Sequence, residues 1–147
     1  MVIRSMKYDD FTVGQSFTTD PVTLGKEDII KFAETYDPQY FHIDEDAAKS
    51  GPFGNIIASG FHTLLVVWRE FVRMDILGFD GMGGVGIEQL QWVKPVCPGD
   101  RLTGTFTILH KRLLSDGKRG LITFQIVIRN QDDEEVLTYQ SKGLIRR

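Results

Sequence analysis

Asp37 and His42 lie five residues apart in the segment DPQYFH. A carboxylate and an imidazole that converge on one point can hold a water molecule and exchange protons with it, which is general acid–base chemistry. Pro38 disfavours helical geometry at Asp37, so we expect the preceding helix to end there and the pair to converge in a bent, non-helical stretch. A continuous helix would turn through about 500° over this spacing and separate them. The alternative is structural, with Asp37 capping backbone amides and His42 packed between Tyr40 and Phe41.

A glycine stands where a long apolar helix is expected to begin. Residues 59–77 carry apolar side chains around most of a helical surface, and Gly60 lies at the start. The first turn of a helix leaves backbone N–H groups without intrahelical partners, and a glycine lets a carbonyl approach them closely. Such donors polarise a thioester carbonyl and stabilise an enolate. The alternative is that Ser59 caps the helix and Gly60 is a spacer.

Other residues that often carry chemistry fit structural roles better in this sequence. His62 and His110 form no metal-ligand spacing, so we expect no metal site. Cys97 lies in an expected turn with no base beside it. Residues 81–86 match the spacing G-x-G-x-x-G, but a dinucleotide site needs a strand before this motif and a helix after it. Here the order is reversed, and we interpret the run as a flexible helix-to-strand connection.

The elements that must position these residues divide the chain into two parts. Residues 26–79 are expected to be rich in helix, with one helix ending near residue 37 and a second over 59–77. From residue 84 onwards, apolar runs separated by Pro, Gly, Asn and Asp predict strands joined by tight turns. Residues 15–24 predict one further strand. Such strands form an antiparallel sheet, and a buried helix against one face gives an α+β fold.

The composition excludes several classes of protein. A chain of 147 residues suits one domain, and its formal net charge of −3 argues against a broad basic surface for nucleic acid. We see neither the apolar core of a signal peptide nor a run long enough to span a membrane. A single cysteine fits a reducing compartment. We therefore expect a cytoplasmic protein with no nucleic-acid or membrane partner.

Several segments resemble the MaoC-like family of (R)-specific enoyl-CoA hydratases and acyl dehydratases, and the likeness covers nearly the whole chain. The hydratase motif of that family is D-x-N-P-[hydrophobic]-H, so Asp37 and His42 match its Asp and His. Gln39 and Tyr40 replace its Asn-Pro pair, and Ser59 stands where hydratases often carry His. The similar segments are DPQYFHIDEDAA at 37–48, SGPFG at 50–54, IASG at 57–60, WVKPV at 92–96 and PGD at 98–100.

The resemblance implies a hot-dog fold over residues 1–147, in which an antiparallel sheet curls around one long central helix. It also implies a homodimer or a dimer of dimers, because pairing edge strands with a second copy satisfies their backbone groups. One chain would then be a complete hot-dog and half of the working dimer.

The same resemblance implies a function in fatty acid metabolism. The expected reaction is reversible hydration of a trans-2-enoyl thioester to a 3-hydroxyacyl thioester, with coenzyme A as substrate carrier and no other cofactor. Asp37 and His42 would hold the water, and the Gly60 amide would hold the thioester oxygen. Further residues expected to contact the substrate are Gln39, Phe53, Gly54, Ala58 and Ser59. Possible phosphate contacts, for which solvated surface is the better interpretation, are Lys94, Arg101, Lys118 and Arg119.

Two other functions stay open. A hot-dog acyl-CoA thioesterase would also use an acid and a helix N-terminus, but its water would attack the carbonyl carbon. The spacing of Asp37 and His42 favours the hydratase. A non-catalytic acyl-thioester-binding protein would keep the fold and the pocket without turnover, and the altered Asn-Pro pair is compatible with that.

Overall fold

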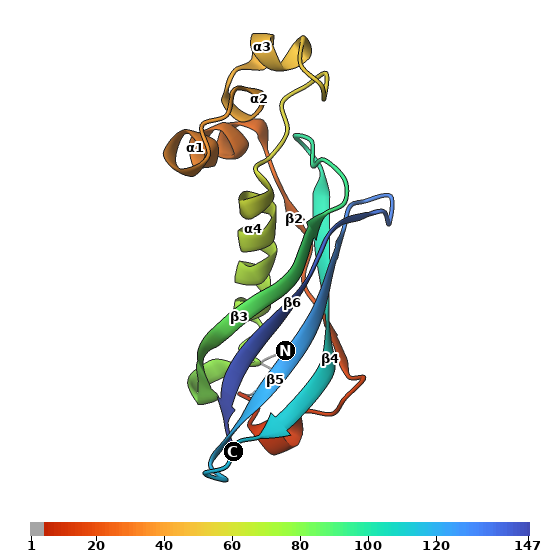
Figure 1. Ribbon diagram of the computed structural model, residues 1–147. Coiled ribbons are helices and arrows are strands. Elements are labelled where there is room, and N and C mark those ends of the chain that lie inside the picture. The colour runs from red at the N-terminus through yellow and green to blue at the C-terminus, as the bar shows by residue number, and fades with distance from the viewer. Residues whose placement is uncertain (1–4) are drawn as a thin grey trace.

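Four long antiparallel strands form most of one sheet (Figure 1). The computed structural model describes residues 5–147. The sheet runs in the order β1-β4-β5-β6-β3, and β2 also pairs with β4. The strands are β1 (Ser16–Thr18), β2 (Val22–Thr23), β3 (Gly81–Trp92), β4 (Arg101–Leu113), β5 (Arg119–Arg129) and β6 (Glu135–Arg146). The antiparallel sheet expected from the tight turns is confirmed.

The long helix α4 (Gly60–Arg73) lies along one face of this sheet (Figure 1). Val67 and Phe71 of the helix are fully buried. Phe71 stacks on Phe106 of β4, with ring centroids 4.0 Å apart and planes inclined by 3°. Burial alternates along β4, as it does when one face of a strand packs on a core and the other does not. An antiparallel sheet curled around one central helix is the hot-dog arrangement, so the expected α+β hot-dog fold is confirmed.

Three shorter helices gather at the end of the molecule where α4 begins (Figure 1). They are α1 (Lys26–Tyr36), α2 (Tyr40–Ile43) and α3 (Glu45–Lys49), and two 3-10 turns, η1 (Tyr8–Asp10) and η2 (Gly78–Asp80), lie elsewhere in the chain. Helix α1 ends one residue before Asp37, as Pro38 predicts. Asp44 then caps α3, because its carboxylate accepts a hydrogen bond from the Ala47 N–H at 3.0 Å.

Three expectations about these elements were wrong. Helix α4 stops at Arg73 and does not reach residue 77, and Asp75 nearby has a positive φ of 58° that a helix cannot continue through. The glycine run 81–86 is the first half of β3, not a connection. Glycines there accommodate the register shifts between β3 and β6. Residues 15–24 form two strands, with Pro21 between them.

Apolar side chains are exposed along β3, which is an end strand of the sheet. Val85 and Ile87 on this strand are 57% and 51% exposed. Phe61 and Leu65 of α4 are also exposed, so the described residues do not cover this helix on every side. Among residues 5–147 no helix is long and apolar enough to cross a membrane.

Candidate active site

The end of α1 and the short helix α2 bring Asp37 and His42 together. The Asp37 N–H still donates to the Ala33 carbonyl at 2.8 Å, but its φ of −152° and ψ of 67° leave the helix. Residue 42 lies on the single turn of α2, so the expectation of a wholly non-helical stretch was wrong for the histidine. Asp37 Oδ2 and His42 Nε2 lie 3.3 Å apart. This convergence makes joint binding of one molecule by both side chains possible.

The imidazole of His42 has a fixed orientation. Its side chain is 5% exposed, and Nδ1 lies 2.7 Å from the backbone oxygen of Ile57. A carbonyl oxygen only accepts hydrogen bonds, so Nδ1 carries the hydrogen in this contact. In the neutral ring Nε2 then presents a lone pair on the side of Asp37. The ring nitrogen nearest to the carboxylate is therefore an acceptor and a proton-transfer atom.

The carboxylate of Asp37 accepts hydrogen bonds at both oxygens. Gln39 Nε2 donates to Oδ1 at 2.8 Å, and Ser59 Oγ donates to Oδ2 at 2.7 Å. Burial raises the pKa of Asp37, but these two hydrogen bonds and the charge of a protonated His42 outweigh it and leave the pKa below its ordinary value of 3.8. Asp37 is thus a carboxylate acceptor across the physiological pH range.

Gly60, the first residue of α4, lies beside His42 in a cleft of about 360 Å³. The amides of this first turn have no partner within the helix. The backbone before Gly60 is held in place, because the Ala58 N–H donates to the Val96 carbonyl at 2.8 Å. A methyl group added at residue 60 would overlap the indole of Trp92. Of the acid–base pair, His42 lines this cleft, and Asp37, which is not among the lining residues, lies 3.3 Å from His42 Nε2. The chemistry available at the cleft is acid–base transfer next to a backbone hydrogen-bond donor.

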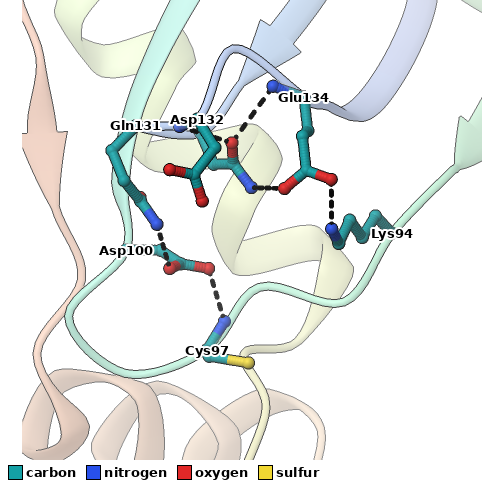
Figure 2. Close-up of polar contacts among 7 residues, drawn as sticks. Lys94, Cys97, Asp100, Gln131, Asp132 and Glu134 are labelled. Atoms are coloured by element: carbon teal, nitrogen blue, oxygen red, sulfur yellow. Dashed lines mark hydrogen bonds and ion pairs between the residues drawn. The ribbon is translucent and has the colours of Figure 1, made fainter.

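A polar network fixes the loop that forms one wall of the cleft. Figure 2 shows Asp100 bridging two segments: its carboxylate accepts from the Cys97 N–H at 2.9 Å and from Gln131 Nε2 at 3.0 Å. Lys94, which lines the cleft, pairs with Glu134 of the β5–β6 turn (Figure 2). Burial raises the pKa of the Cys97 thiol, which keeps it protonated. These contacts hold the wall that carries Val96 and so support the backbone before Gly60.

A model of the MaoC-like domain family matches residues 10–127. The chain belongs to this family. Uncharacterized protein YdeM of Bacillus subtilis is 35% identical over 142 residues, covering 97% of the chain and 100% of that protein. The 3-hydroxyacyl-thioester dehydratase Z of Mycobacterium tuberculosis is 35% identical over 107 residues, covering 71% of the chain and 69% of that protein. The crystal structure of the MaoC-like dehydratase from Rhodospirillum rubrum has a TM-score of 0.90 at 32% identity, covering 97% of the chain and 98% of that structure.

The five residues expected from the MaoC-like resemblance to contact substrate have three different environments. Phe53 and Ala58 line the cleft with His42 and Gly60. The side chains of Gln39 and Ser59 make their hydrogen bonds to Asp37. Gly54 is exposed at a positive φ of 71° and is not among the lining residues.

The cleft also contains residues that sequence reasoning missed. Trp92, at the end of β3, packs against the start of α4, and its ring centroid lies 5.2 Å from that of Phe61. Thr63 is 2% exposed, and its hydroxyl has no hydrogen-bond partner among residues 5–147. The family-like segment WVKPV was a signal for Trp92, whereas Thr63 lies in an apolar helical pattern that hides it. Among the described residues, no cluster of three or more His, Cys, Asp and Glu side chains is arranged to hold a metal ion.

His62 lies outside the cleft and packs against helix α1. Its ring stacks on Phe32 of α1, with centroids 4.4 Å apart and planes inclined by 4°. Burial lowers the pKa of His62 from its ordinary value of 6.5, more than the nearby Asp28 carboxylate raises it. The folded protein therefore binds a proton at this residue less readily than the unfolded chain does.

The free energy of unfolding is accordingly expected to fall as the pH drops below 6.5, because the unfolded chain then gains a proton that the native His62 does not. In His62→Phe, which keeps a ring against Phe32, the fall between pH 7.5 and pH 5.5 is expected to be smaller. Urea denaturation at the two pH values measures this. Equal falls in the wild type and the variant would contradict the assignment.

Proposed function

We propose that this protein catalyses reversible hydration of a trans-2-enoyl thioester to a 3-hydroxyacyl thioester. The observation that carries the proposal is the 3.3 Å approach of Asp37 Oδ2 to His42 Nε2 beside Gly60 at the start of α4. Membership of the MaoC-like family supports it, as does the relative named 3-hydroxyacyl-thioester dehydratase Z. The substrate carrier is coenzyme A in this proposal. Hydration adds only the atoms of water, so the reaction balances without a further cofactor.

Water activation follows from the two acceptors. Atoms 3.3 Å apart can both lie about 2.8 Å from one water oxygen. That water donates one hydrogen to Asp37 Oδ2 and one to His42 Nε2, which leaves its own lone pairs free for C3 of the enoyl group. As the O–C3 bond forms, one water proton passes to the pair and the other stays on the new hydroxyl group. The pair then delivers the proton that it took to C2 and returns to its starting state. In dehydration the same groups act in reverse order.

Charge development at the thioester requires a hydrogen-bond donor. As water adds to C3, electron density moves through C2 to the carbonyl oxygen, which takes on enolate character. The Gly60 amide is proposed to donate to that oxygen, and the partial positive charge at the start of α4 adds to the effect. A side chain at this position would overlap the indole of Trp92, which the glycine accommodates.

The acyl tail needs an apolar site. A cavity of about 420 Å³ lies between α4 and the strands β3 and β6. Leu64 and Trp68 of the helix face it together with Ile87 of β3. Thr63, which lines the catalytic cleft, and Leu64, which lines this cavity, are consecutive residues of α4. We infer that the tail of the substrate lies there.

Two readouts with two substrates distinguish this function from its rivals. Purified protein is incubated with crotonyl-CoA and, separately, with a saturated acyl-CoA of equal length. The proposal expects loss of the enoyl absorbance without release of free thiol, and no change in the saturated thioester. Release of thiol from either substrate indicates a thioesterase. Binding of both thioesters without any turnover indicates an acyl-thioester-binding protein.

We further propose that two copies of the chain associate through β3. The outer edge of this end strand has no partner strand within the described residues, and its neighbourhood exposes Val85, Ile87 and Phe61. Pairing two β3 edges satisfies their backbone groups and covers these apolar side chains. A homodimer, alone or as half of a dimer of dimers, is therefore the expected assembly.

Val85→Lys is expected to convert this dimer to a monomer, because it places a charge on the apolar edge strand. The molar mass from light scattering measures the change. Val13→Lys is the matched control, since Val13 is exposed to the same degree (56% against 57%) but lies in the loop before β1. A wild-type monomer, or a dimer that Val85→Lys leaves intact, would contradict the proposed interface.

A further inference from the structure

Ser59 occupies the N-cap position of α4 but does not cap the helix. Serine at this position normally accepts a hydrogen bond from an amide of the first helical turn. Here no such side-chain bond is present, and the hydroxyl donates instead to Asp37 Oδ2 at 2.7 Å. Ser59 is fully buried, and the Asp37 carboxylate that it contacts is partly exposed. Its hydroxyl joins the start of α4 directly to the acid–base pair.

We propose that Ser59 is a positioning residue that orients Asp37 Oδ2 toward His42 Nε2 and stabilises the negative charge of the carboxylate. This inference rests on the proposed hydration, in which Oδ2 binds the reacting water. It differs from the role that the family resemblance implies for Ser59, which is contact with the substrate. Oδ2 accepts from Ser59 on one side and keeps a second lone pair for the water, since a carboxylate oxygen accepts about two hydrogen bonds.

The surroundings of Asp37 contain few other polar groups that could do this. Of the side chains in residues 5–147, those in polar contact with its carboxylate are Ser59 from the start of α4, His42 from α2 and Gln39 from the turn between α1 and α2. Gln39 is exposed and bonds the other oxygen, Oδ1. His42 is the titratable member of this set. Ser59 is thus the buried neutral donor to the oxygen that faces the histidine.

Loss of the Ser59 hydroxyl is expected to raise the pKa of Asp37. A hydrogen bond to the carboxylate favours its charged form, and the Ser59 hydroxyl is the largest of the contacts that lower the pKa of Asp37. Without this hydrogen bond, less remains to counteract the effect of burial, which raises the pKa of Asp37. As the pH is lowered, the carboxylate of the variant is then protonated sooner than that of the wild type. A reaction that needs this carboxylate ionised therefore begins to lose rate at a higher pH in the variant than in the wild type.

The test is a pH titration of the Asp37 carboxyl carbon by NMR in wild type, Ser59→Ala and Ser59→Thr, with Asp37→Asn to assign the signal. We expect the midpoint to move up by about one pH unit in Ser59→Ala and to return toward wild type in Ser59→Thr, which keeps the hydroxyl. Ser59→Gly is a second variant without the hydroxyl, and glycine is tolerated at helix N-caps. An unmoved midpoint in folded Ser59→Ala or Ser59→Gly overturns the proposal.

A kinetic readout separates positioning from substrate contact. Positioning predicts that the acid limb of the kcat/KM profile moves up with the carboxyl midpoint while KM for the enoyl thioester stays near wild type. Substrate contact predicts a raised KM with an unmoved midpoint, and that result would also overturn the proposal. The NMR titration needs no turnover, so a wild type that does not hydrate enoyl thioesters refutes the proposed function without affecting the test of Ser59.

Discussion

Asp37→Asn is expected to lower kcat/KM for hydration of crotonyl-CoA by about 10²–10⁴-fold, the usual contribution of a positioned acid–base group. Asparagine keeps the size of the side chain and still accepts from Ser59, but it carries no charge and does not take a proton from water. His42→Ala is expected to cause a loss of similar size, because the water would have one acceptor left. Stopped assays of enoyl absorbance at fixed pH measure both variants.

The two residues are proposed to act on one water, so their effects are expected to be non-additive. The double variant Asp37→Asn/His42→Ala is predicted to be about as slow as the slower single variant. Asp46→Asn is the matched control, because this exposed aspartate on α3 makes no contact with the cleft. If Asp37→Asn and His42→Ala each kept wild-type rates in the folded protein, the proposed acid–base pair would be wrong.

Gly60→Ala is expected to lower kcat by about 10²–10³-fold, which is the typical effect of losing one donor to a developing oxyanion. The amide itself remains in the alanine variant, but the added methyl group and the indole that it displaces are expected to obstruct the approach of a carbonyl to that amide. The same methyl overlaps the indole of Trp92, so the tryptophan must move. Initial rates with crotonyl-CoA, together with thermal melting, measure the effect on catalysis separately from the effect on folding.

Two companion variants separate the causes. Gly25→Ala adds the same methyl group at the start of α1, where it meets no atom within 4 Å and lines neither the cleft nor the proposed tail cavity, and is expected to leave the rate unchanged. Gly60→Ala/Trp92→Ala relieves the overlap with the indole. If carbonyl approach is what the glycine provides, this double variant stays slow. Full recovery of the rate would show that the loss came from displacement of Trp92 alone.

Local rules predicted the fold where one residue determines the geometry. Pro38 marked the end of α1 because proline restricts the residue before it. The length of α4 was overestimated, because apolar residues continue past Arg73 although the chain leaves the helix there. The start of β3 was missed because its local sequence gives no strand signal. Its glycines carry no strand preference of their own, and pairing with β6 holds them in the sheet.

The candidate site was predictable only in part. The spacing of Asp37 and His42 was enough to suggest that they meet, because both lie in one short segment. The contacts of Gln39 and Ser59 with Asp37 could not be predicted, since these residue types fit contact with substrate as well as contact with Asp37. That choice depends on the approach of the start of α4 to the end of α1, a tertiary contact over 22 residues. Thr63 was hidden for a related reason: an apolar helix does not show which of its faces borders a cleft.

The most direct test of the central claim is mass spectrometry of the product formed from crotonyl-CoA in H₂¹⁸O. The proposed reaction joins the water oxygen to C3, so one ¹⁸O is expected in an intact 3-hydroxyacyl-CoA, with no free acid and no free thiol. The labelled product should form about 10²–10⁴-fold more slowly when Asp37→Asn replaces the wild type under the same conditions. Label in the carboxylate of a free acid would contradict the account, because the water would then have attacked the thioester carbonyl.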